Sequence, residues 1–212
     1  MNMEDLKLRL MQKAPTIQRF RIEDNWENIA MALLEAYKII VDGRTIPYEK
    51  NKYIWNACKS TAKWLTEGKK TGLLFYGNVG NGKTTMTRAI CSLVNTLYFS
   101  ASSDERKTIF MFSALELEKM IVDDPLRFQK LKKCPMLCID DIGLEAQKIK
   151  SWGNELQPIP ELIYYRYDNQ LLTIASSNLC KEDLQVKYGE RIGDRFAEIF
   201  DRIAFTHKSF RK

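Results

Sequence analysis

One eight-residue segment constrains this chain more than any other, the loop Gly77-Asn78-Val79-Gly80-Asn81-Gly82-Lys83-Thr84. It matches the pattern G-x-x-x-x-G-K-S/T at every fixed position, between an apolar run and a helical pattern. In such a loop the backbone N–H groups wrap phosphates, the lysine brings a cation to the β and γ groups, and the hydroxyl can ligate Mg²⁺. The flanking pattern disfavours the alternative, an ordinary glycine turn. We expect a nucleoside triphosphate to contact Gly77, Asn78, Val79, Gly80, Asn81, Gly82, Lys83, Thr84 and Thr85.

Helical patterns alternate with short apolar runs after residue 50, which is typical of a parallel sheet covered on both faces. A capping-box pattern starting at Ser113 predicts one of the helices between the strands. The expected fold class is therefore α/β. The five expected strands are 72–76, 108–112, 135–141, 171–176 and 203–206.

Polar side chains stand where two of these strands end. In sheets of this type ligands sit at the carboxyl ends of the strands, so Asp140 and Asp141 are expected to face the phosphate loop. We expect Asp140 and Thr84 to hold Mg²⁺ and Asp141 to polarise the attacking water; the alternative is a solvated acidic turn. Asn178 follows the fourth strand, where its amide could orient that water or contact the γ-phosphate. Its alternative role is a cap for a helix over 181–186.

Arg191 and Arg195 lie one helical turn apart near the C-terminus. One interpretation is surface salt bridging with acids of the same helix. The sharper interpretation is an arginine presented to the γ-phosphate of a neighbouring subunit, where it stabilises charge in the transition state. Glu145 also has two open interpretations, support of the acidic site or the start of the next helix.

Composition favours anionic partners, because the formal net charge is +6 and the isoelectric point is near 9.0. Five cysteines in apolar segments read as reduced core residues, and a single histidine leaves no credible zinc set. No apolar run approaches membrane-spanning length, so we expect no membrane partner and a cytoplasmic location. Five lysines that flank the third strand could contact nucleic acid phosphates or simply be solvated: Lys130, Lys132, Lys133, Lys148 and Lys150.

The chain is expected to divide into an N-terminal helical extension at 1–50 and a main domain at 51–212. Apolar spacing predicts a short helix near the start and a stronger one from Trp26 to Ile40, stopping at Gly43. The apolar stripe of the second helix is expected to pack on the body of the protein. A partner-binding extension is the alternative.

Four segments, taken in order, resemble the bacterial helicase-loader ATPases of the AAA+ superfamily, the DnaC and DnaI type, and the related IstB transposition ATPases. They are GNVGNGKT, CPMLCIDDIGLE, ELIYYRYDNQLLTIASSNL and YGERIGDRFAEIFDR. The resemblance implies a P-loop NTPase with an AAA+ type αβα sandwich, a five-stranded parallel sheet and no C-terminal lid domain. It implies Walker A at Lys83 and Thr84, Walker B at Asp140 and Asp141, sensor 1 at Asn178, and an arginine finger with its companion at Arg191 and Arg195.

The expected function is that of an ATP-binding, Mg²⁺-dependent ATPase that works as an oligomeric switch on DNA, either single-stranded, which is the first choice, or duplex. The resemblance makes a replicative helicase loader the first choice, with self-association in the ATP state and the extension contacting a replicative helicase or a transposase. A transposition ATPase of the IstB type is the alternative. A self-contained small-molecule phosphotransferase and a scaffold that scarcely hydrolyses ATP are further rivals.

Overall fold

A computed structural model describes residues 2–13, 20–44, 47–99, 108–151, 153–207 and 209–210. Five of the strands in these ranges form one parallel sheet, and two form a separate hairpin. The sheet strands are β1 (Gly72–Gly77), β2 (Ile109–Ser113), β3 (Met136–Ile142), β6 (Leu172–Ser177) and β7 (Phe200–Phe205). The antiparallel hairpin consists of β4 (Ile149–Ser151) and β5 (Asn154–Leu156).

The helices alternate with these strands. Those before and just after the phosphate loop are α1 (Met3–Lys13), α2 (Trp26–Asp42), α3 (Lys52–Glu67) and α4 (Lys83–Phe99). Those of the second half are α5 (Ala114–Asp123), α6 (Pro125–Lys132), α7 (Pro158–Asp168), α8 (Lys181–Tyr188) and α9 (Glu190–Ile199). No helix in the described part of the chain is long and apolar enough to cross a membrane.

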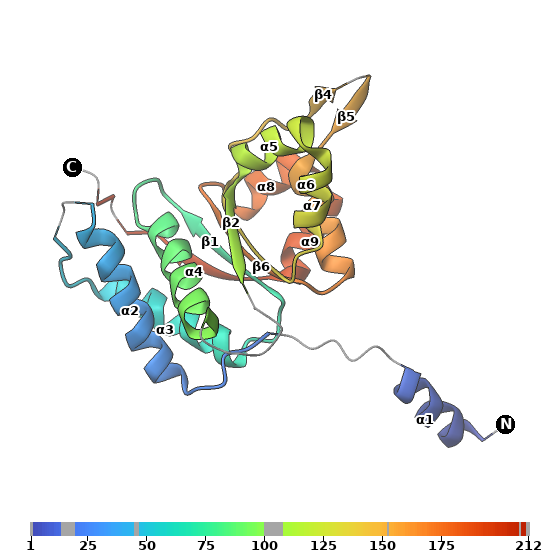
Figure 1. The fold of residues 1–212 in the computed structure, drawn as a ribbon, viewed down its shortest axis with the longest axis horizontal. Helices are drawn as coiled ribbons and strands as arrows, with labels where there is room; N and C mark the ends of the chain where they lie inside the picture. The colour runs from blue at the N-terminus through green and yellow to red at the C-terminus, as the bar shows by residue number, and fades with distance from the viewer. Residues whose placement is uncertain are drawn as a thin grey trace.

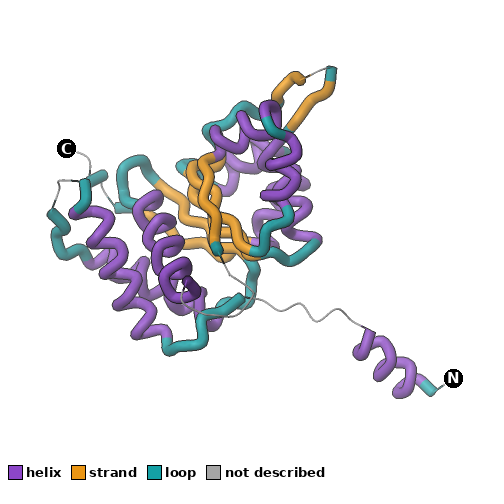
Figure 2. The backbone as a smooth tube through the Cα atoms, in the orientation of Figure 1, coloured by secondary structure: helices purple, strands orange, loops and turns teal. Residues whose placement is uncertain are grey.

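The sheet lies between two layers of helices, with the strand order β2-β3-β6-β1-β7 (Figure 1). Successive side chains of a strand point to opposite faces, so the buried strands are apolar on both sides. Leu73 and Phe75 of β1 pack with α2, α3 and α4, whereas Leu74 packs with helices of the second half. Figure 2 shows the two helical layers on either side of the strands, with the β4–β5 hairpin projecting from one end. This is the expected αβα sandwich.

Four sheet strands lie within one residue of their expected bounds, and β7 is the exception. Residues 203–206 were expected as the fifth strand, but the structure extends it from Phe200 to Phe205. Only these two end residues are buried, because β7 is an edge strand whose middle faces solvent. Its start therefore lacks the apolar run by which the other strands were found. The β4–β5 hairpin was not expected at all.

The predicted helix from Trp26 packs into the main core. Ile29, Leu33 and Tyr37 of α2 are buried in the cluster that also contains α3, α4 and one face of the sheet. Burying a side chain such as Leu33 contributes about 1.5–3 kcal/mol, so this contact is a substantial part of the fold. The expectation that this stripe packs on the body agrees with the structure. The functional division of the chain near residue 50 stays a prediction.

Candidate functional site

The phosphate loop follows β1 and its backbone depends on glycine. Gly77, Gly80 and Gly82 have φ angles of 130°, 79° and 94°, a region that side-chain-bearing residues rarely adopt. A Cβ on Gly77 would also collide with the carbonyl of Phe205, and one on Gly82 would collide with the hydroxyl of Tyr37. The loop can therefore pass close to β7 and α2 only because these positions lack side chains.

Lys83 begins α4 and turns its ammonium group back over the loop. Its Nζ donates to the carbonyl oxygens of Gly77 at 2.8 Å and Asn78 at 2.7 Å, and to Oδ1 of Asn81 at 3.3 Å. The residue is only 4% exposed, although its charge is costly to bury. These bonds hold the cation beside the loop at the N-terminal end of α4, where the helix dipole also favours an anion.

Thr84 and Asp140 meet where the loop and β3 come together. Oγ1 of Thr84 donates to Oδ1 of Asp140 at 3.2 Å, and Oγ of Ser176 donates to the same oxygen. Asp140 is 6% exposed, so its carboxylate is partnered rather than solvated. A hydroxyl and a carboxylate suit Mg²⁺, which usually takes one or two protein oxygens and completes its shell with phosphates and water. The residues therefore fit the expected Mg²⁺ site.

Metal binding without a nucleotide has less support. Among the described residues, no group of three or more His, Cys, Asp and Glu side chains is arranged to hold a metal ion. A divalent ion at Thr84 and Asp140 would need phosphate oxygens as further ligands.

Asp141 occupies a kink in β3. Its φ is 55°, and the register between β3 and β6 shifts between Ile139 and Ile142. Its N–H donates to Oγ of Ser176 at 2.9 Å, so the same hydroxyl contacts both acidic residues. Because of the kink, the side chain of Asp141 does not follow the regular alternation of side chains between the two faces of the sheet. Asp141 is half-exposed, whereas the neighbouring Asp140 is buried.

Asn178 directly follows β6, between the ends of β1 and β3. Ser177, the residue before it, pairs with Tyr76 of β1 and with Ile142 of β3. The helix-cap alternative fails, because Cys180 caps α8 and forms a capping box with Asp183. Asn178 thus lies at the carboxyl edge shared with the phosphate loop and Asp140.

Arg191 and Arg195 both lie on α9 and stack on tyrosines of α7. The guanidinium of Arg191 is 5.5 Å from the ring centroid of Tyr164. That of Arg195 is 4.1 Å from the ring of Tyr167 and pairs with Glu198 at 3.1 Å. Surface pairing within the helix therefore does occur at Arg195. The role across a subunit interface stays a prediction for both residues.

Ser176 and Tyr188 support this edge, and the sequence analysis missed both. Tyr188 donates to the carboxylate of Glu145, which is 2% exposed and also accepts the N–H of Gly143 at 2.9 Å. Burial and the nearby carboxylate raise the pKa of Tyr188. Glu145 therefore fixes the turn after β3 and does not start a helix. The one feature of the sequence that could have pointed to Ser176 is that an apolar strand ends there in two serines.

The segment after β7 lies against the phosphate loop. The N–H of Phe210 donates to the carbonyl of Gly80 at 2.9 Å, and the side-chain amide of Asn81 donates to the carbonyl of Phe205. The ring of His207 stacks on Tyr53 of α3, with centroids 5.4 Å apart and planes within 5°. Burial lowers the pKa of His207. These contacts connect α3, the loop and the end of the chain.

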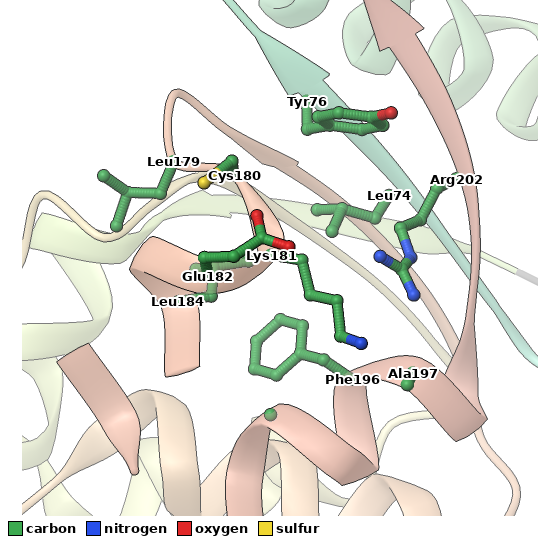
Figure 3. Close-up of a pocket in the computed structure, with 11 residues that line it drawn as sticks. Leu74, Tyr76, Leu179, Cys180, Lys181, Glu182, Leu184, Phe196, Ala197 and Arg202 are labelled. Atoms are coloured by element: carbon green, nitrogen blue, oxygen red, sulfur yellow. The ribbon is translucent and has the colours of Figure 1, made fainter. Parts of the chain in front are cut away.

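A separate cavity of about 170 Å³ lies between β1, α8, α9 and β7, on the face of the sheet that the helices of the second half cover (Figure 3). Lys181 and Arg202 line it together with Phe196 and other apolar side chains. None of the expected site residues lines this cavity, so it is distinct from the nucleotide site.

The five lysines expected as candidate nucleic acid contacts differ in their surroundings. Lys132 pairs with Glu161 at 2.7 Å and Lys148 pairs with Glu155 at 2.6 Å. Lys130, Lys133 and Lys150 are exposed. The two paired lysines are partly neutralised by their partners, which weakens the case for this group as one phosphate-binding surface.

No family model matches the chain, but comparisons with individual proteins find relatives in sequence and in fold. The replicative helicase loader DnaI of Bacillus subtilis is 28% identical over 148 residues, which is 65% of this chain. The match covers 44% of that relative, so this chain spans less than half of its length.

Solved structures share the fold. A crystal structure of the DnaC helicase loader matches with a TM-score of 0.57 and 22% identity, covering 74% of this chain and 92% of that one. A crystal structure of DnaI matches with a TM-score of 0.58 and 19% identity, covering 79% and 89%. AMPPCP-bound DnaA from Aquifex aeolicus has a TM-score of 0.51 and 18% identity, covering 74% and 48%. The chain shares the fold of these loader and DnaA structures, and its sequence is similar to that of the DnaI loader.

Proposed function

We propose that this chain, which resembles the DnaC and DnaI type of AAA+ helicase loader, is the ATPase domain of a replicative helicase loader. The observation that carries the proposal is the meeting of Lys83, Thr84 and Asp140 at one edge of the sheet, in a chain whose sequence matches a loader. ATP is the proposed nucleotide; the AMPPCP bound to the structurally similar DnaA supports this choice.

Each side chain at this edge has a proposed role. Lys83 binds the β and γ phosphates, and Thr84 and Asp140 hold Mg²⁺, which neutralises charge on those phosphates. Asp141 polarises the attacking water, because it is the half-exposed acid beside the buried Asp140. Asn178 orients that water or contacts the γ-phosphate from the end of β6.

The remaining charge stabilisation is proposed to come from a second copy of the chain. Arg191 and Arg195 lie on α9, stacked on α7, and no described contact joins either guanidinium to the phosphate loop of its own chain. An arginine from a neighbouring subunit would complete the site and make hydrolysis depend on assembly. ATP binding would then favour association on DNA, and hydrolysis would release it.

A helicase-loading assay tests the proposal directly. The full chain is mixed with the replicative helicase of its host, ATP and a single-stranded DNA circle, and helicase retained on the circle is measured. We expect retention to rise with the chain and ATP, and not with the Lys83→Ala variant. If the helicase is neither bound nor retained, the loader proposal is wrong. Binding of a transposase in the same format would favour the transposition alternative.

A further inference from the structure

Three lysines on the solvent face of α3 each sit over an aromatic ring. The distances from ammonium nitrogen to ring centroid range from 4.4 to 5.8 Å. We name these three pairs the lysine–aromatic row: Lys52 over Tyr53, Lys59 over Trp55 and Lys63 over Trp26, the first residue of α2. Such pairs hold an ammonium group near a ring by attraction to its π face.

Helix geometry places the three lysines in line. At 3.6 residues per turn, positions 52, 59 and 63 fall within about 40° of one another around the helix axis. With a rise of about 1.5 Å per residue, they extend over roughly 16 Å. The row is therefore a narrow track along α3 rather than scattered surface charge.

The charge of this region is unbalanced. Residues 49–70 contain six lysines and two glutamates, so a tenth of the sequence carries most of the formal net charge of +6. No described carboxylate lies within ion-pair distance of Lys52, Lys59 or Lys63, in contrast to Lys132 and Lys148. The exposed acids nearest in sequence to the row are Glu23, Asp24 and Glu27 around Trp26, and Glu49 and Glu67 on either side of α3.

The chemistry of the row selects one kind of ligand. Ammonium groups in line contact the phosphates of a polyanion. The rings beside them, of which Tyr53 is exposed and Trp26 and Trp55 are partly buried, offer their exposed parts as surfaces on which unpaired bases stack. In a duplex the bases are already stacked on one another, so Trp26 and Trp55 would gain nothing from it. An acidic peptide would use the lysines alone. A single strand of nucleic acid uses both.

We propose that the lysine–aromatic row binds single-stranded nucleic acid, with Lys59 and Lys63 as its principal cations. The proposal rests on the proposed function for its biological role, since it supplies the surface by which a loader ATPase would hold a strand. The row also reaches the nucleotide site. Tyr53 stacks on His207, whose ring packs 4.7 Å from that of Phe210, and Phe210 is bonded to Gly80 of the phosphate loop.

The test measures binding of labelled dT20 and rU20 strands to the full chain by fluorescence anisotropy across a salt series, with ATP and Mg²⁺. The test variant is Lys59→Glu with Lys63→Glu. The matched control is Lys130→Glu with Lys133→Glu, which makes the same charge change at exposed lysines of the group flanking β3. We expect the α3 variant to lose at least about tenfold in affinity at 0.1 M salt, and its salt slope to fall by about 1.4. The control should lose less than about threefold.

Two further measurements separate the alternatives. A Lys59→Gln and Lys63→Gln variant should show a smaller loss of the same kind, with unchanged melting temperature and nucleotide affinity. Equal competition by poly-glutamate and dT20, at matched charge, would overturn the proposal in favour of an acidic protein ligand. The DNA and RNA arms distinguish the two sources of single strand.

Loss of binding in the control but not in the α3 variant would overturn the proposal, as would no binding by the parent chain at low salt. Either result leaves the proposed function standing if the chain still hydrolyses ATP and loads helicase. Conversely, a chain that binds strands through α3 but neither hydrolyses ATP nor binds helicase would remove the loader proposal alone.

Discussion

Thr84 and Asp140 stand 56 residues apart in the sequence, yet their side-chain oxygens lie 3.2 Å apart. Thr84 belongs to the first turn of α4 and Asp140 to the end of β3, so this contact joins the phosphate loop to the acidic strand end. Ser176 of β6 donates to the same carboxylate and extends the junction to a third element.

Lys83→Ala is expected to abolish measurable ATP binding. The ammonium group is positioned by two loop carbonyls and by Asn81, and charge-assisted bonds to phosphate are among the strongest in proteins. Calorimetry with Mg²⁺ should show affinity reduced by about 100-fold or more. Lys119→Ala, an exposed lysine of α5, is the control and should bind ATP as the parent does. Near-parental affinity in the Lys83 variant would contradict the assignment.

Asp141→Asn should leave ATP binding nearly intact while removing turnover. Asparagine tolerates the left-handed backbone that Asp141 adopts at φ 55°, so the kink in β3 should survive. The amide cannot accept a proton, and kcat should fall by about 100-fold or more. Steady-state phosphate release and nucleotide titration together measure both effects. Hydrolysis at the parental rate would show that another group polarises the water.

Ser176→Ala is expected to slow hydrolysis about tenfold and to cost about 1–2 kcal/mol of stability. The change removes a donor to Asp140 and the hydroxyl that accepts the N–H of Asp141. Ser177→Ala is the control, because its hydroxyl donates to the carbonyl of Ile142 and not to either acid. Both variants should have a lower melting temperature than the parent, and only Ser176→Ala should lose turnover. An equal loss of kcat in the two variants would make the role of Ser176 merely structural.

Local patterns were enough to find most of the fold. The three inner strands β1, β3 and β6 were recognisable because their residues are largely buried on both faces, and the edge strand β2 was recognisable by its apolar run. The capping box at Ser113 is formed as expected. The β4–β5 hairpin has three-residue strands without buried side chains, so no periodicity in the sequence predicted it. Arg166 is a further case. It reads as a surface residue among tyrosines, yet it is 1% exposed.

Arg166 illustrates why sequence alone is insufficient. Its guanidinium donates to Oγ1 of Thr173 at 2.8 Å and to the carbonyl of Cys134 at 2.9 Å, joining the amino ends of β3 and β6. Burial lowers its pKa to about 10. These partners are brought together only by the sheet, so no local pattern identifies them. The same holds for Ser176 and for Tyr188 in the candidate site, whereas the phosphate loop and Asp140 follow from contiguous motifs.

A mixing experiment tests whether the site is completed by a second subunit. Arg191→Ala and Arg195→Ala keep the phosphate loop, and Lys83→Ala keeps the arginines. The variant of the arginine that acts across the interface should not hydrolyse ATP alone, and neither should Lys83→Ala. When an arginine variant is mixed with Lys83→Ala, some composite sites with measurable turnover should form, and the specific activity of the parent should rise with protein concentration.

Comparing Arg191→Ala with Arg195→Ala, each mixed with Lys83→Ala, identifies which arginine acts across the interface. To reach a neighbouring subunit, Arg195 would have to break its ion pair with Glu198 and its stack on Tyr167. The described contact that Arg191 would have to break is its stack on Tyr164. A self-contained phosphotransferase has a complete site in each chain, so full activity in both arginine variants, with no concentration dependence in the parent, would contradict the assembly mechanism.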